Sequence, residues 1–276
     1  MAQQLDSATR EALLARVRFY RDLGLTEFYR RPVDPALLAQ LASNPATASE
    51  IFDSTSNPVL AQEEHAVPPR KHMPAAPEIA ALVPAAERAA ALQLIREEIG
   101  ECTRCALHKG RNKIVFGDGD PAARLMFVGE GPGADEDAQG LPFVGKAGQL
   151  LNNMIAAMGL RREEVYIANV VKCRPPGNRV PEQEEGATCS PFLVRQIDVV
   201  RPQVLVALGA TAATWLLGSR QPLAGLRGRV HSARGTKLIV TYHPAYLLRD
   251  PRQKKEAWAD LQIAMRELGL KPPGKG

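Results

Sequence analysis

Four short, almost unbroken runs of apolar residues constrain the fold of this chain more than any other feature. They are rich in Val, Ile, Leu, Phe and Tyr, as is typical of strands that are covered on both faces. The runs are Arg124–Glu130, Val165–Val171, Val204–Gly209 and Lys237–His243. Segments with helical periodicity alternate with them: Gly148–Met158, Pro181–Val199, Thr211–Leu217 and Pro251–Leu268. This alternation predicts a parallel sheet that lies between two layers of helices.

The first third of the chain has a different character. Residues 1–41 contain short helical patterns, and residues 42–84 are rich in Ala and Pro and have little periodicity, so we expect a small helical segment and a flexible linker. A helix over Ala85–Ile99 then opens the main domain, residues 85–276. No run of about 18 apolar residues could span a membrane. Because no basic region followed by an apolar one opens the chain, we expect a cytoplasmic protein.

The positive charge belongs to the main domain. The net charge is +5, and residues 96–276 carry 26 of the 35 Lys and Arg but only 19 of the 30 Asp and Glu. A basic domain suggests a polyanionic partner such as nucleic acid. A solvated positive face without a partner is the plainer alternative.

Polar residues follow the predicted strands at the edge where a parallel sheet binds its ligands. Ligands bind beyond the carboxyl ends of such strands. Glu130 lies in a glycine-rich turn after the first run, Asn169 lies in the second, and His243 ends the fourth. Phe143 lies in a Pro/Gly loop where little helix or strand face is available to it, so it could stack on a ligand. Ordinary local packing for Phe143 and a surface position for His243 are the alternatives.

The glycine-rich turn Gly129–Gly133 could instead be a nucleotide-binding loop. Two features count against this interpretation. Asp135, Glu136 and Asp137 follow at once and would repel phosphates, and the next helix is expected only after Gly145.

The four cysteines of the chain form a second candidate site. Cys102 and Cys105 have CxxC spacing, and Cys173 and Cys189 follow far downstream, which suits a site with two ligands from one turn and two from a second loop. Such a site could hold zinc or an iron–sulfur cluster. Four unrelated buried thiols are the remaining possibility.

Several motifs together resemble the family 4 uracil-DNA glycosylases. They are Gly129–Gly133, Glu136–Asp137, Pro142–Gly148, Asn169, Lys172–Pro176 and Tyr242–Ala245. The likeness covers roughly Ala91–Leu268. It implies an α/β/α sandwich with a central four-stranded parallel sheet. It also implies a [4Fe–4S] cluster held by Cys102, Cys105, Cys173 and Cys189.

The resemblance implies substrate-binding roles for four residues. Phe143 would stack on a uracil flipped out of DNA, and Asn169 would hydrogen-bond its edge, since an amide offers a donor and an acceptor side by side. Glu136 would lie near C5 of the base and disfavour the methyl group of thymine. Gly131 would permit close backbone approach.

The resemblance also implies the chemistry. His243 would stabilise the negative charge that grows on uracil O2 as the glycosidic bond breaks, and Glu130 would position or polarise the attacking water. No lysine in the motifs is placed as a Schiff-base nucleophile. We therefore expect a monofunctional glycosylase of base excision repair, which leaves an abasic site.

Four further residues are expected to contact DNA. Lys172, Arg174 and Arg249 would bind phosphates, which makes binding salt-dependent. Leu248, in a loop over Tyr246–Arg249, would act as a wedge that helps to displace the base; in the alternative, this segment begins the last helix and its leucines lie in the core. We expect a monomer that acts on uracil-containing DNA and does not bind membranes.

Two other functions stay open at this point. Domains similar to this one accompany DNA polymerases and could bind DNA without catalysis, although a pure binder has no need of the pocket residues named above. The other is a zinc-binding regulator built on the cysteines.

Overall fold

The computed structural model of the chain describes residues 82–271. The predicted helical segment at residues 1–41 and nearly all of the predicted linker at residues 42–84 lie outside the described residues. The described part begins just before a short 3₁₀ turn, η1 (Ala85–Glu87), and the helix α4 (Arg88–Ile99).

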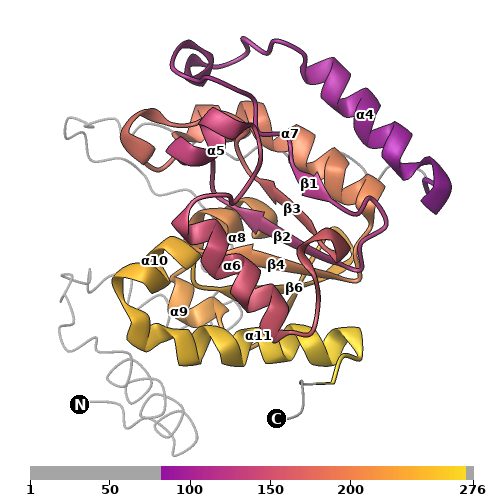
Figure 1. The fold of residues 1–276 in the computed structure, drawn as a ribbon, viewed down its shortest axis with the longest axis vertical. Helices are drawn as coiled ribbons and strands as arrows, with labels where there is room; N and C mark the ends of the chain where they lie inside the picture. The colour runs from indigo at the N-terminus through magenta and orange to yellow at the C-terminus, as the bar shows by residue number, and fades with distance from the viewer. Residues whose placement is uncertain (1–81, 272–276) are drawn as a thin grey trace, which may run out of the picture. The chain divides into compact units, whose positions relative to one another are not determined.

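A six-stranded sheet forms the centre of the fold (Figure 1). The strands are β1 (Asp118–Gly119), β2 (Leu125–Gly129), β3 (Tyr166–Asn169), β4 (Val204–Leu208), β5 (Val230–Ala233) and β6 (Thr236–Thr241). Their order is β1-β3-β2-β4-β6-β5. The four inner strands are parallel, whereas β1 and β5 pair antiparallel at the two edges.

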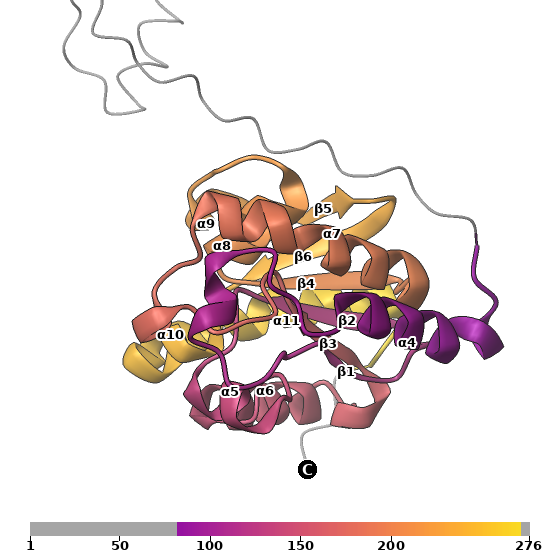
Figure 2. The same ribbon diagram turned by 90° about the horizontal axis from the view of Figure 1, so that it is seen from above.

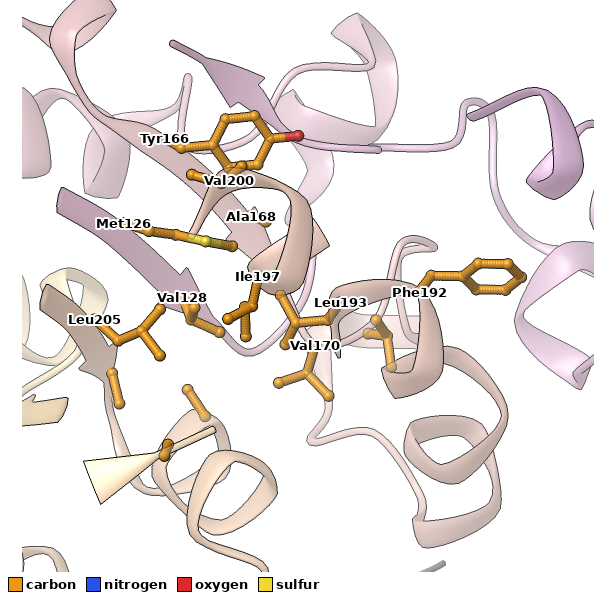
Figure 3. Close-up of a cluster of buried hydrophobic side chains, with 14 of the residues drawn as sticks. Met126, Val128, Tyr166, Ala168, Val170, Phe192, Leu193, Ile197, Val200 and Leu205 are labelled. Atoms are coloured by element: carbon orange, nitrogen blue, oxygen red, sulfur yellow. The ribbon is translucent and has the colours of Figure 1, made fainter. Parts of the chain in front are cut away.

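Alternate side chains of each inner strand enter two separate cores. Met126 and Val128 of β2 pack into one core with Leu205 of β4, whereas Leu125 and Phe127 point into the other. Figure 3 shows the first core, where side chains of the sheet meet those of the long helix behind it. Because both faces are buried, every position of β2, β3 and β4 is apolar or enclosed, which explains the unbroken apolar runs.

Helices cover both faces of the sheet and make three layers (Figure 1 and Figure 2). Helices α4, α7 and α8 pack on one face, and α6 and α11 pack on the other. The helices after α4 are α5 (Ala134–Gln139), α6 (Lys146–Ala157), α7 (Gln183–Val200), α8 (Ala210–Leu217), α9 (Leu223–Leu226), α10 (Pro244–Arg249) and α11 (Lys254–Leu268). Within residues 82–271, no helix is both long and apolar enough to cross a bilayer.

Three expectations from the sequence need correction. The sheet is mixed and six-stranded, because two short edge strands flank the four parallel ones. A helix, α5, begins directly after Gly133, although its first turn carries three carboxylates that would still repel a phosphate. The segment over Tyr246–Arg249 is neither a loop nor the start of the last helix, since it belongs to the separate short helix α10.

The strand order reverses direction at β2, which makes one edge of the sheet the expected place for a ligand. Strand β2 lies between β3 and β4. The chain runs from β2 to β3 on one side, and then passes over β2 to β4 on the other side. Connections that depart in opposite directions leave a crevice at the carboxyl ends of the two strands. We use the name rim site for the predicted pocket residues that lie at or near this edge: Glu130, Gly131, Glu136, Phe143, Asn169 and His243.

Candidate active site

Asn169 is the most unusual residue of the rim site. It ends β3 with 1% of its surface exposed, and both its Oδ1 and its Nδ2 are buried without a hydrogen-bond partner. Within residues 82–271, no other buried side-chain nitrogen or oxygen lacks a partner. Leaving such a group unpaired costs about 1–3 kcal/mol. Both polar atoms of the amide are thus left without a partner, and a group that offers an acceptor and a donor side by side would satisfy them.

Phe143 lies beside this amide because Gly129 has no side chain. A Cβ on Gly129 would lie 2.3 Å from Oδ1 of Asn169 and 2.7 Å from the Phe143 ring. The ring is 5% exposed, and its centroid lies 5.5 Å from that of the His243 ring. An aromatic face, an imidazole and an unpaired amide thus meet at one place.

His243 is held as a neutral imidazole by its surroundings. It caps α10, and the backbone N–H of Ala245 donates to its Nδ1 at 3.1 Å. Since Nδ1 accepts this bond, the proton of the neutral ring is assigned to Nε2, which is left as a donor. Burial, with a smaller contribution from Arg249, lowers the pKa of His243 to about 4, against the opposing effect of Glu136.

Glu130 connects the ends of β2 and β4. It follows β2 directly, and its Oε2 accepts a hydrogen bond from the Thr211 hydroxyl in the first turn of α8. This contact joins the two connections that leave the sheet in opposite directions. The second carboxylate oxygen stays available at the rim for a water or a substrate group.

Glu136 braces two loops of the rim site. Its Oε2 accepts from the N–H of Gly133 at 3.0 Å, and its Oε1 accepts from the N–H groups of Val144 and Gly145 at 2.9 and 3.0 Å. The side chain therefore ties the glycine-rich turn to the loop that carries Phe143. Gly131 is also constrained, because a Cβ there would lie 2.7 Å from a methyl carbon of Val171.

The residues predicted to contact DNA separate into exposed and buried ones. Leu248 is 44% exposed on α10, Arg249 beside it is exposed, and the neighbouring Leu247 is buried. Arg174 is half-buried and its Nε donates to Asn178.

The prediction for Lys172 is wrong. This side chain is 1% exposed, and its Nζ donates to the carbonyl of Asn169 at 2.9 Å and to Oε1 of Gln196 at 2.5 Å. Burial lowers its pKa to about 8. An ammonium enclosed among protein acceptors is not available to a phosphate, because it would first have to break both bonds and leave the core.

The four cysteines line one cavity on the α4 and α7 side of the sheet. Cys102 and Cys105 lie between α4 and η2 (Ala106–Lys109), and Cys173 lies in the loop after β3. Cys189 lies within α7 rather than in a second loop. All four are free thiols. Within residues 82–271, no three His, Cys, Asp or Glu side chains are grouped as ligands of a single metal ion.

Hydrogen-bond donors surround the sulfur atoms. Arg111 donates from Nη1 to Sγ of Cys173 at 3.5 Å, and the backbone N–H of Lys172 donates to Sγ of Cys189 at 3.3 Å. Burial raises the pKa of the Cys173 thiol, and raises that of Cys189 to about 12. Buried thiols that face donors fit a bound cationic group, which would favour their thiolate forms.

Comparison with known proteins identifies the family. The model of the uracil DNA glycosylase superfamily matches residues 116–262. The chain belongs to this superfamily. Its members include the type-4 uracil-DNA glycosylase of Thermotoga maritima, which is 48% identical over 161 residues, 58% of this chain and 84% of that protein. The type-4 uracil-DNA glycosylase of Archaeoglobus fulgidus is 43% identical over 187 residues, 65% of this chain and 94% of that protein.

A more distant similarity concerns a larger protein. The DNA polymerase of Bacillus phage SP01 is 28% identical over 162 residues, which are 58% of this chain but only 17% of that polymerase. The superfamily domain thus also has a counterpart inside a polymerase chain.

Two residues near the rim site were missed from the sequence. Thr211 follows β4 on the predicted rim, so the position of ligand sites in parallel sheets could have indicated it. Arg162 lies at the start of η3 (Arg162–Glu164), outside every motif, and contacts the loop of Phe143. No pattern in the sequence distinguishes it from Arg161 beside it.

Proposed function

We propose that this protein excises uracil from DNA by hydrolysing the N-glycosidic bond, which leaves an abasic site. The observation that carries the proposal is the unpaired, buried amide of Asn169 beside the ring of Phe143. A flipped uracil presents an adjacent acceptor and donor, O4 and N3–H, and a flat face for stacking. The names of the type-4 relatives support the same substrate.

The reaction needs stabilisation of charge at two places. As the bond breaks, the base leaves as an anion and the sugar becomes cation-like. A donor prearranged toward the developing oxyanion contributes about 2.7–4 kcal/mol. The free Nε2–H of a neutral His243 suits uracil O2, and the carboxylate of Glu130, oriented by Thr211, suits the attacking water.

Base selection rests on the shape and charge of the rim site. Because backbone donors already occupy both oxygens of Glu136, this residue would disfavour thymine through its bulk and charge near C5. Gly131 would let the substrate approach the backbone closely. Phe143 would hold the flipped base by stacking.

DNA must be distorted before the base can enter. Flipping a nucleotide costs a few kcal/mol. An exposed Leu248 on α10 could offset this cost as a wedge, and Arg249 and Arg174 could bind the flanking phosphates. We expect a monomer to suffice, because one chain supplies the whole rim site.

The cysteine cavity fits a [4Fe–4S] cluster held by Cys102, Cys105, Cys173 and Cys189. Four free thiols around one cavity suit it, with N–H donors to Cys173 and Cys189, and the family resemblance favours iron over zinc. When bound, the cluster would crosslink the start of the domain, the loop after β3 and α7. We propose a structural role for it.

A base-release assay tests the function. The full chain is incubated with U:G, U:A, single-stranded uracil and hypoxanthine oligonucleotides, and cleavage is read after alkali treatment, which breaks the strand at abasic sites. We expect cleavage of the uracil substrates and its loss in Asn169→Ala. Uracil strands that stay intact would refute the proposal.

The match to a polymerase chain favours one other function, a DNA-binding module without catalysis. The two are distinguished by binding. A wild-type protein that binds DNA but releases no base would favour the module, whereas an Asn169→Ala variant that binds and no longer cleaves would favour the enzyme.

A further inference from the structure

The loop that carries Phe143 adopts a backbone conformation that needs support. The φ angle of Phe143 is +52°, in the left-handed region that bulky residues rarely adopt. Such a conformation is energetically unfavourable and persists only when surrounding contacts impose it. The contacts that impose it therefore decide where the ring lies.

Glu136 supports this loop from one side through the N–H groups of Val144 and Gly145. Gly148 permits the tight packing beneath it, since a Cβ at Gly148 would lie 1.9 Å from the carbonyl oxygen of Phe143. The hydrogen bonds from Glu136 pair the two N–H groups that follow Phe143. The carbonyl of Phe143 itself needs a hydrogen-bond donor from another residue.

Arg162 holds the carbonyl side of the loop. Its Nη2 donates to the carbonyl of Pro142 at 2.5 Å, and its Nη1 donates to the carbonyl of Phe143 at 3.1 Å. Two successive carbonyls thus accept from the two arms of one guanidinium, a pattern that the planar fork of arginine allows and the single ammonium of lysine does not.

Arg162 is itself held in place. Nη1 also donates to Oδ1 of Asn152 in α6 at 2.9 Å, and Nη2 lies 3.8 Å from a carboxylate oxygen of Asp118 in β1. Its side chain is 23% exposed. The residue thus links the Phe143 loop to α6 and to the edge of the sheet.

We infer that Arg162 is a positioning residue for base recognition: its guanidinium fixes the Phe143 loop so that the aromatic ring is ready to stack on the flipped base. This inference rests on the proposed excision of uracil. Arg162 does not touch the substrate and acts only through Phe143.

The test measures Arg162→Lys and Arg162→Gln on single-stranded uracil DNA. Misplacement of a contact by about 1 Å can reduce turnover about 100-fold, so we expect kcat/KM to fall roughly 10- to 100-fold in both variants. Arg161→Gln is the matched control, because Arg161 is exposed and its ion pairs within residues 82–271 are with Glu163 and Glu164. It should stay within about twofold of wild type.

A double-mutant cycle separates positioning from general stability. In a Phe143→Ala background, Arg162→Lys should change kcat/KM by less than about threefold, because the ring through which Arg162 acts is gone. A second readout is affinity for an oligonucleotide with 2′-fluoro-2′-deoxyuridine, which resists cleavage. Arg162→Lys should weaken binding to this probe and leave binding to undamaged DNA unchanged.

Three results would overturn the inference: full activity in both Arg162 variants, an equal loss with and without Phe143, or an equal loss of affinity for damaged and undamaged DNA. Thermal unfolding is measured alongside, and Arg162→Lys keeps the charge and most of the side chain in case Arg162→Gln is unstable. If the wild type releases no uracil, the proposed function fails instead.

Discussion

At the scale of single residues, the rim site combines groups that proteins normally avoid. Asn169 has two buried polar atoms without partners, and Phe143 has a left-handed backbone. His243 is a half-buried imidazole whose pKa is lowered to about 4. The unpaired amide and the left-handed backbone each reduce the stability of the free protein, whereas His243 does so only when acid protonates it. Residues that we propose to bind the base therefore lower the free energy of unfolding of the free protein.

The stability of the protein should depend on pH through His243. An unfolded histidine has a pKa near 6.5, so between pH 6.5 and 4 the unfolded chain binds a proton that the folded chain does not. The contribution of this group is complete above pH 6.5 and is lost as the pH falls toward 4. We expect His243→Asn to lose less of its free energy of unfolding than wild type over this range, as measured by urea unfolding.

The same variant should lose roughly 100- to 1,000-fold in kcat at neutral pH, because the donor to the leaving base is altered. Unfolding free energies that fall in parallel with pH in both proteins would contradict the assigned pKa. Unchanged kcat would contradict the assigned role.

At the scale of elements, a buried polar network joins β3 to α7. The ammonium of Lys172 binds the carbonyl of Asn169 and Gln196, and Gln196 in turn donates to the carbonyl of Phe116 at 3.0 Å. Asn169 belongs to the rim site, and Cys173 follows Lys172 directly. The network therefore lies between the rim site and the cysteine cavity.

Lys172→Met and Arg249→Gln should affect different properties. Removing the buried ammonium leaves two acceptors unpaired, so Lys172→Met should lower the free energy of unfolding by about 2–4 kcal/mol. Its salt dependence of DNA binding should match wild type. Arg249→Gln should keep its stability, whereas its slope of log K against log salt should become less negative by about 0.9 on duplex DNA.

The measurements are chemical unfolding and titration of the 2′-fluoro oligonucleotide at several salt concentrations. A weaker salt dependence in Lys172→Met would indicate that Lys172 contacts DNA phosphates, and would contradict the buried position seen in the structure.

At the scale of the whole molecule, the cysteine cavity joins segments that are far apart in sequence. Cys102 follows α4 and Cys189 belongs to α7, on one face of the sheet, and Cys173 follows a central strand. A bound group would thus link the start of the described domain to its centre. Metal binding that needs a formed site adds its free energy to folding.

Cys189→Ala should therefore lose iron, its visible absorbance and thermal stability together. We expect the midpoint of thermal unfolding to fall by roughly 10 °C or more. Ser190→Ala is the matched control, one position further along α7. Zinc in place of iron in wild-type protein, or an unchanged iron content in the variant, would refute the assigned cluster.

The four inner strands, and the shared edge where Glu130, Asn169 and His243 lie, could be predicted from local patterns alone. Strands buried on both faces must be apolar along their whole length, so Leu125–Gly129 and Val204–Leu208 could be recognised without any knowledge of their neighbours. The carboxyl ends of parallel strands share one edge, which placed Glu130, Asn169 and His243 together. The cysteine spacing likewise indicated a shared site.

The partners of each side chain became known only from the folded arrangement. The edge strand Asp118–Gly119 has no apolar run, because it owes its existence to pairing with β3. From the sequence, Lys172 was predicted to be a surface charge, but in the fold it binds Gln196 and the carbonyl of Asn169. Arg162 cannot be told from Arg161 in the sequence, and only its contact with the Phe143 loop distinguishes it. Burial and hydrogen bonding depend on groups that are distant in sequence, and local patterns do not encode them.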